Sequence, residues 1–332
     1  MNNFCTVITA DYLPYAKQLY ISLSENFSKG LILHVLVSDG KEKLKLPLES
    51  EFLQNMKFYN GDEIKLPMAD KLHQKYAKNN MDAYRWSMKS VFIKFLLQQN
   101  TVEKIIYLDS DIHFIGNGDF LFEMLSEYRF LITPHWRCAS NPQADFVNFQ
   151  LNFTEGIYNG GFIGANKNSF EILDFWSNCC LANCEINREN GFFVDQKYLD
   201  ILPSRFEGIR RVEHKGCNLA GWNMIECPRS ENDSSELKID GDFDPIFIHF
   251  TPGTRKEIIE GNDILLKPFF ERYNQLLQTY SENSIDLMKP IETNDQESSE
   301  EKNSEPLLEA VRRRVRLRTR IQAFMDGRIV RK

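Results

Sequence analysis

The sequence predicts an α/β protein with a mostly parallel, Rossmann-like central sheet that is covered by helices on both faces. Two apolar runs, residues 4–9 and 31–37, flank a segment with helical spacing, and a third run at 104–108 follows a second helical segment. Strands that are apolar throughout are typical of sheets buried on both faces, and strand–helix–strand order gives parallel neighbours. With 332 residues, of which 42% are hydrophobic, the chain is long enough to bury such a core.

The first half of the chain supplies most of the predicted sheet. Each run is assigned from its apolar spacing, which has a period near 3.6 in helices and is continuous in buried strands. The predicted elements are a strand at 4–9, a helix through 16–23, a strand at 31–38 that ends in the Asp39-Gly40 turn, a strand at 55–61 within a looser stretch at 41–78, a helix at 81–100 and a strand at 102–109.

The second half continues the alternation with more loop. The predicted elements are a strand at 129–136, a strand-like segment at 153–169, a helix at 170–185, a short helix that starts near Asp195, strand-and-loop segments at 209–224 and 244–257, and a helix at 266–282. We therefore expect one domain over residues 1–280.

The composition changes after this domain. Residues 281–305 are polar, acidic and almost without aromatics, which predicts a flexible linker. Residues 306–332 carry nine Arg or Lys against two acids, so this tail is about +7 and the remainder about −14 of the net −7. Its apolar residues share one broad side of a helical wheel, which Arg314 and Arg318 interrupt. A basic amphipathic helix favours attachment to an anionic membrane surface, and a partner helix, nucleic acid or a solvated end are the alternatives.

The chain also carries signals about its compartment. It shows no secretory leader and no run of ~18 apolar residues, so we expect a cytoplasmic protein, with the tail allowing a peripheral position at the inner face of the plasma membrane. Seven scattered cysteines favour reduced, buried thiols. The run CCLANC at 179–184 suggests either a zinc ligand set or simply a helix face.

Two aspartates stand at the end of the apolar strand KIIYL. Asp109 and Asp111 can turn to one side where the strand breaks, and paired carboxylates are hard ligands for Mn²⁺ or Mg²⁺. His249 ends another apolar strand and would complete a metal site that keeps open positions for phosphate oxygens. A solvated turn and a structural histidine are the alternative interpretations.

Five segments in this order resemble the GT-A-fold nucleotide-sugar glycosyltransferases, specifically the family-8 group that includes glycogenin and bacterial lipopolysaccharide galactosyl- and glucosyltransferases. The resemblance covers roughly residues 4–255. The segments are TVITADYLPYAKQLYISL, KIIYLDSDIHF with the DxD motif, YNGGFIGANK, FFVDQKYLD and IHFTPG.

The resemblance implies a metal-dependent transfer of sugar from a UDP-sugar to a glycan or glycolipid acceptor, with no nucleic acid as partner. It assigns the metal to Asp109, Asp111 and His249, and Asp195 and Gln196 to the anomeric carbon as catalytic residues. The implied donor-binding residues are Thr9, Ala10, Asp11, Tyr12, Arg85, Lys89, Asp109, Ser110, Asn159, Gly160 and Gly161. If the family's retaining outcome holds, the leaving phosphate oxygen takes the acceptor proton; in an inverting reaction Asp195 is the general base.

The chain departs from the family pattern at two places. The loop HKGCNLAGWNM resembles that of a related bacterial group and implies acceptor contacts from His214, Asn218, Trp222 and Asn223. The family's Lys-Pro-Trp is missing after the last His-Phe, where Arg255 and Lys256 can supply phosphate charge. The competing functions are a Mg²⁺ phosphohydrolase, a nucleotidyltransferase and a non-catalytic sugar-nucleotide binding protein.

Overall fold

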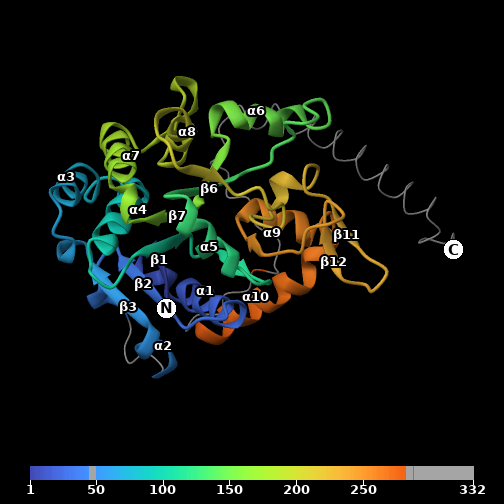
Figure 1. Ribbon diagram of the computed structural model, residues 1–332, viewed down its shortest axis with the longest axis horizontal. Coiled ribbons are helices and arrows are strands. Elements are labelled where there is room, and N and C mark those ends of the chain that lie inside the picture. Colours follow the sequence, from blue (N-terminus) through green and yellow to red (C-terminus); the bar gives the residue numbers. More distant parts are fainter. Residues whose placement is uncertain (45–49, 282–286, 288–332) are drawn as a thin grey trace.

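A computed structural model describes residues 1–44, 50–281 and Leu287 (Figure 1). Its centre is a seven-stranded sheet. In spatial order the strands are β10 (Ile209–Arg211), β6 (Phe130–Pro134), β7 (Tyr158–Asn166), β4 (Lys104–Leu108), β1 (Asn2–Ile8), β2 (Leu31–Val37) and β3 (Met56–Asn60). The strand pairs are parallel except on the two sides of β7, which runs antiparallel to β4 and β6. The predicted α/β class with a mostly parallel sheet is confirmed.

Three two-stranded ladders and ten α-helices complete the described part of the chain. The ladders are β13 (Phe247–His249) with β5 (Ile112–Phe114), β11 (Arg229–Glu231) with β12 (Leu237–Ile239), and β8 (Ile186–Asn187) with β9 (Phe192–Phe193). The helices are α1 (Leu13–Asn26), α2 (Ser50–Asn55), α3 (Pro67–Tyr76), α4 (Met81–Leu97), α5 (Asp119–Glu127), α6 (Phe146–Thr154), α7 (Phe170–Ala182), α8 (Leu202–Arg205), α9 (Pro252–Ile259) and α10 (Lys267–Tyr280).

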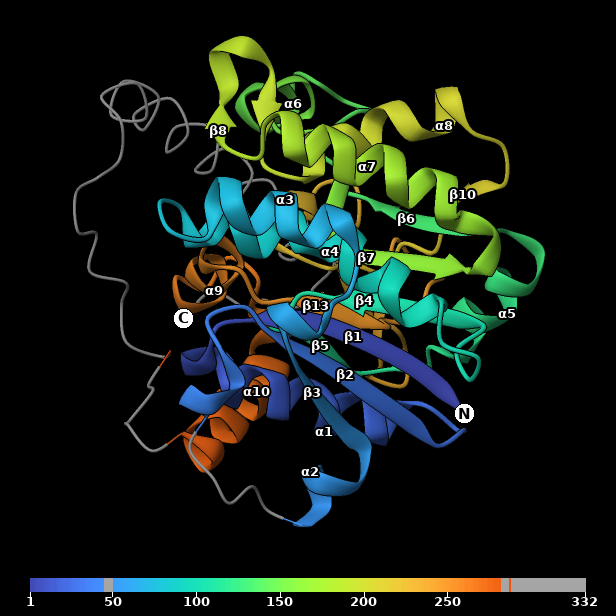
Figure 2. The same cartoon turned by 90° about the vertical axis from the view of Figure 1, so that its left-hand side faces the viewer.

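Helices cover both faces of the sheet, as Figure 2 shows. Side chains alternate along β1, so that Cys5 and Val7 pack with α3, α4 and α7, whereas Phe4 and Ile8 pack with α1, α2 and α5. A third apolar cluster joins α9 and α10 around Phe250. The sheet is thus buried on both sides, and its strand ends remain as the place for a site.

The sheet register gathers four chain segments at one edge. Phe4 of β1 pairs with Ile106 of β4, so that both strands end at the same edge. Because β7 is antiparallel, its first residues lie there too, and Asp109 N donates to Gly161 O over 2.8 Å. The ladder of β5 with β13 adds His249 opposite Ile112. Residues distant in sequence therefore meet beyond β4.

Several sequence expectations need correction. The segment 153–157 is not strand, because α6 extends to Thr154 and β7 begins at Tyr158; residues 252–257, expected as strand and loop, begin α9. Helices α3, α5 and α6 were not expected. The reason for α6 is physical: it has no buried residue, so its apolar spacing does not mark a core-facing side. The predicted linker at 281–305 and tail at 306–332 lie almost wholly outside the described residues. No helix of the described part is long and apolar enough to cross a membrane.

Candidate active site

Asp109, Asp111 and His249 form a cluster beyond the end of β4. Each offers one ligand atom, and these atoms lie within 4.8 Å of one another. A tight turn, in which Ile112 N donates to Asp109 O over 3.1 Å, brings the two carboxylates to one side. His249 Nε2 lies 3.0 Å from Asp111 Oδ1. The structure therefore assembles the ligand set that the sequence predicted.

The surroundings of this cluster fit a divalent ion. A Cβ on Gly161 would lie 2.6 Å from His249 Cε1 and 3.1 Å from Asp109 Oδ2, so only glycine leaves the space open. His249 Nδ1 is buried and has no hydrogen-bond partner in the described structure. Two carboxylates with one imidazole suit Mn²⁺, and Mg²⁺ is compatible with the oxygens.

Without an ion, Asp111 and His249 compensate each other's charge. Burial lowers the pKa of His249, but the Asp111 carboxylate outweighs this and raises it. Conversely, burial raises the pKa of Asp111, and His249 reverses the sign so that the net shift is downward. A divalent ion bound here would take over the role of the imidazolium proton.

Lys89 of α4 lies inside the protein beneath the cluster. Its Nζ is 3.1 Å from Asp109 Oδ1 and 3.4 Å from Asp195 Oδ2, and it donates to Gly160 O over 3.0 Å. Burial lowers the pKa of Lys89, but the two carboxylates raise it overall. With its Nζ beside three protein groups and 4% of the side chain exposed, Lys89 is held between Asp109 and Asp195, and its contact with a donor stays a prediction.

Asp195 and Gln196 stand at the start of the 3₁₀ segment Gln196–Ile201, where a helix start was expected near Asp195. Trp176 Nε1 donates to Asp195 O over 2.8 Å, and Gln196 Oε1 accepts from Gly160 N over 2.9 Å. Asp195 is 1% exposed, and its Oδ2 has no hydrogen-bond partner in the described structure. Burial is the main cause that raises the pKa of Asp195 to about 6.

This shift predicts how Asp195→Asn changes stability in the metal-free protein. The folded state holds the Asp195 proton more tightly than the unfolded state, so stability falls as pH rises between the ordinary pKa of 3.8 and about 6. At about pH 7.5 the wild type carries the full penalty, which is on the order of 3 kcal/mol. Urea denaturation in EDTA should show the variant more stable than wild type at that pH, with the gain vanishing near pH 4. Asp70→Asn at an exposed position of α3 is the control, and an equal gain at both pH values would contradict the assignment.

The expected nucleotide side shows a second group of residues. The Arg85 guanidinium lies over the Tyr12 ring, 5.5 Å from its centre, and the Arg85 Nε is buried without a partner in the described structure. Thr9 Oγ1 donates to Asp11 Oδ1 within the same turn. Ala10 N donates to Asp39 Oδ1 over 2.8 Å. Asp39 was noted in the sequence only as part of a turn, and its place at the end of β2 beside β1 could have marked it.

Asn159 acts on the site through the backbone. Its Oδ1 accepts from Gly161 N over 2.7 Å, and its Nδ2 contacts His135 Nε2 at 3.1 Å. Because an amide NH₂ can only donate, His135 carries its proton on Nδ1, which lies 3.0 Å from Gly156 O. Burial lowers the pKa of His135, in keeping with a neutral ring. Sequence reasoning missed His135 because no local spacing links it to Asn159.

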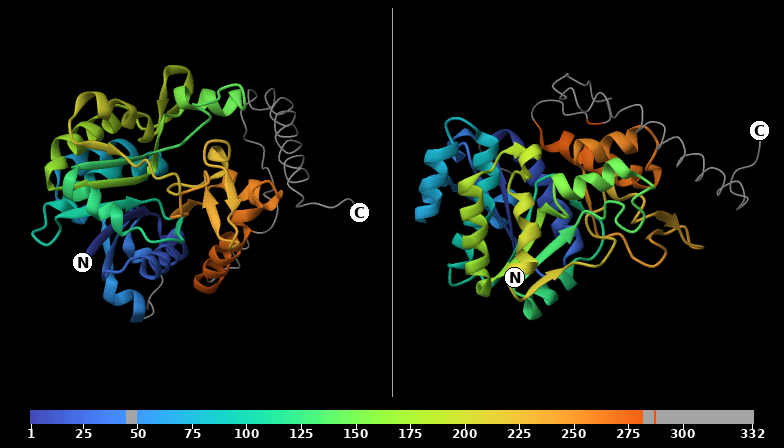
Figure 3. Two further views of the ribbon diagram at one scale, coloured as in Figure 1. Left: turned by 45° about the vertical axis from the view of Figure 1, so that its right-hand side comes forward. Right: turned by 90° about the horizontal axis from the view of Figure 1, so that it is seen from above.

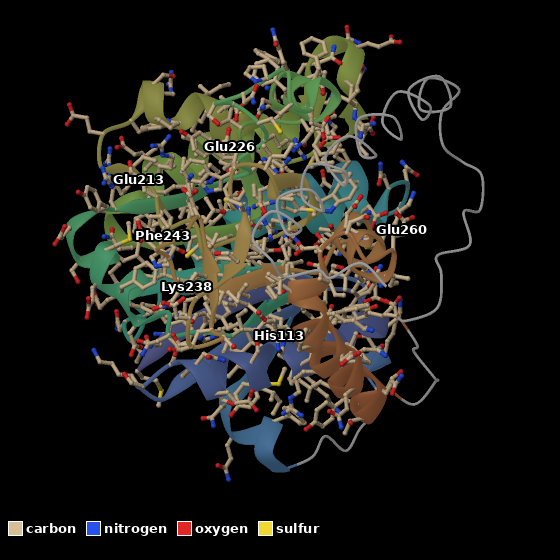
Figure 4. The ribbon with its side chains drawn as sticks, turned by 90° about the vertical axis from the view of Figure 1, so that its right-hand side faces the viewer. His113, Glu213, Glu226, Lys238, Phe243 and Glu260 are labelled. Atoms are coloured by element: carbon tan, nitrogen blue, oxygen red, sulfur yellow. The ribbon has the colours of Figure 1, made fainter. Side chains whose placement is uncertain are left out.

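Of the four predicted acceptor residues, Trp222 lies against the cluster of Asp109, Asp111 and His249. The ring centres of Trp222 and His249 are 5.6 Å apart. Asn223 Nδ2 donates to Asn218 O over 2.7 Å, so Asn223 holds the loop itself, and Asn218 Nδ2 donates to Pro134 O over 3.3 Å. His214 packs between Phe120 and Phe243, with ring centres at 5.3 and 5.0 Å. Phe243 is labelled in Figure 4.

Hydrogen bonds from Gln18, which sequence reasoning did not single out, fix the turn at Asp109–Asp111. Buried Gln18 of α1 donates to Ser110 O over 2.8 Å and to Ile112 O over 3.0 Å, and its Oε1 lies 2.9 Å from His113 Nδ1. His113 is labelled in Figure 4 beside α10. Ser110 therefore shapes the turn through its carbonyl. A glutamine in an otherwise amphipathic helix carried no signal for this role.

The CCLANC run gives no metal site in the described structure. Cys180 and Cys184 are buried in the core cluster of α3, α4 and α7. Among described residues, the group of His, Cys, Asp or Glu placed to hold an ion is Asp109, Asp111 and His249. The helix-face interpretation of the cysteines is the one that fits.

The strand order of this sheet, the helices on both of its faces and the Asp-Asp-His cluster at the strand ends are features of the GT-A fold. The galactosyltransferase LgtC, solved with donor and acceptor sugar analogues, is 12% identical with a TM-score of 0.55, over 83% of this chain and 95% of that chain. Apo mouse xyloside xylosyltransferase 1 is 13% identical with a TM-score of 0.50, over 76% and 98%. The chain has the GT-A fold of these glycosyltransferases, and the predicted resemblance to family 8 is confirmed at the level of the fold.

Two curated proteins are similar in sequence to this chain, but their names state no activity. No family model matches the chain. Uncharacterized protein YfnF of Bacillus subtilis (strain 168) is 24% identical over 251 residues, which are 75% of this chain and 80% of the relative. Uncharacterized protein YfnD of the same organism is 24% identical over 256 residues, 75% of this chain and 77% of the relative.

Proposed function

We propose that the chain is a metal-dependent hexosyltransferase that moves a hexose from a UDP-sugar to a glycan acceptor. The observation that carries the proposal is the cluster of Asp109, Asp111 and His249 at the strand ends of a GT-A sheet. Asp195 is linked to this cluster through Lys89. LgtC, which shares the fold, was solved with donor and acceptor sugar analogues, and this supports a donor and an acceptor side here.

Different residues would bind the metal ion, the nucleotide and the acceptor sugar in this reaction. Asp109, Asp111 and His249 would hold Mn²⁺ or Mg²⁺, which supplies Lewis-acid stabilisation of the leaving diphosphate. Tyr12 offers a ring for stacking the base, and the Arg85 guanidinium beside it offers charge to the diphosphate. Gly161 leaves room for the donor, and Trp222 supplies an apolar wall for the acceptor sugar.

Asp195 and Gln196 are the proposed catalytic residues. A carboxyl group whose pKa is about 6 is largely ionised at neutral pH, so Asp195 can stabilise positive charge that develops at the anomeric carbon. We assign a retaining outcome, in which the leaving phosphate oxygen accepts the acceptor proton. The acceptor is a lipid-linked or cell-surface glycan, such as a lipopolysaccharide intermediate, handled at the cytoplasmic face of the membrane.

The test is a panel of UDP-sugars incubated with the purified full chain and Mn²⁺. Slow UDP release with one hexose donor supports the transferase, and NMR of the released anomer reports retention or inversion. Phosphate release from simple phosphomonoesters would instead indicate a phosphohydrolase, and release of pyrophosphate from UTP and a hexose 1-phosphate would indicate a nucleotidyltransferase. Calorimetric binding of a UDP-sugar without any turnover would identify a non-catalytic binding protein.

A further inference from the structure

Helix α6 turns asparagine side chains toward the protein and phenylalanine side chains toward solvent, which is the reverse of an ordinary surface helix. Its two asparagine side chains face the protein: Asn148 Nδ2 donates to Trp222 O over 2.6 Å, and Asn152 Nδ2 donates to Arg137 O over 2.8 Å. Its aromatic side chains face outward, with Phe146 56% and Phe153 65% exposed. A surface helix normally buries its apolar side, so this arrangement indicates a contact surface.

The outward side of α6 carries a stripe of phenylalanine side chains beside exposed Gln150. The ring centres of Phe146 and Phe149 are 6.2 Å apart, and those of Phe149 and Phe153 are 5.4 Å apart. None of the nine residues of α6 is charged. Exposed Ile157 extends the stripe beyond the helix, and its backbone N donates to Asp200 beside exposed Ile201. Figure 3 shows α6 at an edge of the molecule.

The helix that carries the stripe contacts the candidate active site through its inward side. Asn148 holds the Trp222 carbonyl, and the Trp222 ring packs against His249. At the other end of α6, Gln196 Nε2 donates to Glu155 O over 3.0 Å. A surface that contacts the stripe therefore lies beside the residues proposed to receive the acceptor.

We propose that the α6 stripe, defined as Phe146, Phe149, Phe153 and Ile157, seats the protein on an anionic lipid bilayer, so that the acceptor side of the site faces the membrane. The inference rests on the proposed function, because a lipid-linked acceptor has to be reached at a bilayer surface. Uncharged aromatic side chains are suited to the interface of the bilayer, where their rings enter the headgroup region.

The tail gives the charge that complements such a bilayer. Residues 306–332 carry nine Arg or Lys against two acids. The nineteen residues between Leu287 and Leu307 can span at most about 65 Å, so the tail is tethered within this reach of Leu287. Attraction by the tail is electrostatic and screened by salt, whereas attraction by the stripe is apolar and persists in salt.

Sedimentation with phosphatidylcholine–phosphatidylglycerol vesicles separates the two contributions. The full chain is tested without donor or metal ion, so the result does not depend on catalysis. At about 0.5 M NaCl, where the Debye length is roughly 4 Å, the double variant Phe146→Ser with Phe153→Ser should lower vesicle partitioning on the order of tenfold. Circular dichroism confirms that the variant is folded.

The matched control is Ile264→Ser, because Ile264 is 63% exposed, close to the value for Phe153, but stands outside α6. It should partition like wild type. Equal partitioning of the double variant and wild type would overturn the proposal, as would a double variant that only changes the oligomeric state in light scattering, which would assign the stripe to a second copy of the chain. Deleting residues 306–332 should remove the salt-sensitive part of the binding and leave the salt-resistant part.

Discussion

Asp111→Asn is expected to abolish Mn²⁺ binding and to lower the rate of UDP release by at least about a thousandfold. The reason is that Asp111 contributes an anionic ligand between His249 and the open side of the cluster, with Oδ1 3.0 Å from His249 Nε2. Asparagine keeps the shape but not the charge, so the ion loses one of two carboxylates that offset its charge. Calorimetry with Mn²⁺ alone and a UDP-release assay measure the two effects separately.

Asp70→Asn is the matched control, because it removes the same charge from an exposed position on α3, away from the cluster. It should bind Mn²⁺ and release UDP like wild type. If Asp111→Asn still bound Mn²⁺ with unchanged affinity, the cluster would not be the metal site. If it lost Mn²⁺ but kept UDP release, the reaction would not depend on the ion.

The parts of the site that lie close together along the chain could be predicted from sequence. Asp109 and Asp111 follow an apolar strand directly, and strand ends of α/β sheets are where ligands bind, so their position alone suggested a metal site. His249 was found in the same way, at the end of its own strand. In these cases local pattern and tertiary position agree.

The parts that depend on distant contacts could not be predicted. Lys89 was expected near the donor from the resemblance, but its place between two carboxylates follows from the meeting of α4 with Asp109 and Asp195. His135 and Gln18 act through hydrogen bonds to residues 24 and 92 positions away. A single sequence contains no periodic signal for such pairs.

Helix α6 shows a different reason for failure. Periodicity identifies a helix by assuming that its apolar side is buried, and in α6 Asn148 and Asn152 occupy the inward positions. The exception coincides with the surface that we assign to the membrane. Local rules tend to break at functional surfaces, because exposure of apolar side chains there is offset by binding and not by folding.

The buried charges of the site explain why Lys89 should be the residue most costly to replace. Asp109 and Asp195 approach each other only because Nζ of Lys89 lies between them, 3.1 Å from one and 3.4 Å from the other. Asp195 is buried, and the Asp109 charge adds to burial in raising its pKa. Removing the ammonium leaves like charges facing each other in a medium that screens them poorly.

Lys89→Met should therefore destabilise the metal-free protein by about 3–5 kcal/mol, since methionine keeps the length of the side chain but removes the ammonium counter-charge of Asp109 and Asp195. Urea denaturation in EDTA measures the loss. Lys94→Met is the control on the same helix: its ion pair with Asp174 is 2.5 Å long, but Asp174 is 48% exposed, so the expected cost is about 1 kcal/mol or less. A loss for Lys89→Met no larger than for Lys94→Met would contradict this account.

Two further measurements separate a charge effect from a packing effect. Mn²⁺ places positive charge beside Asp109, so it should restore more stability to Lys89→Met than it adds to wild type. Adding Asp195→Asn to Lys89→Met removes one of the two repelling carboxylates, so the double variant should be more stable than Lys89→Met alone, with a coupling of about 1–3 kcal/mol. If Lys89→Met only lost packing, Mn²⁺ would stabilise it no more than wild type, and Asp195→Asn would add no more stability to it than to wild type. If both responses occur, Lys89 is the counter-charge that lets Asp109 and Asp195 share one site before a metal ion arrives.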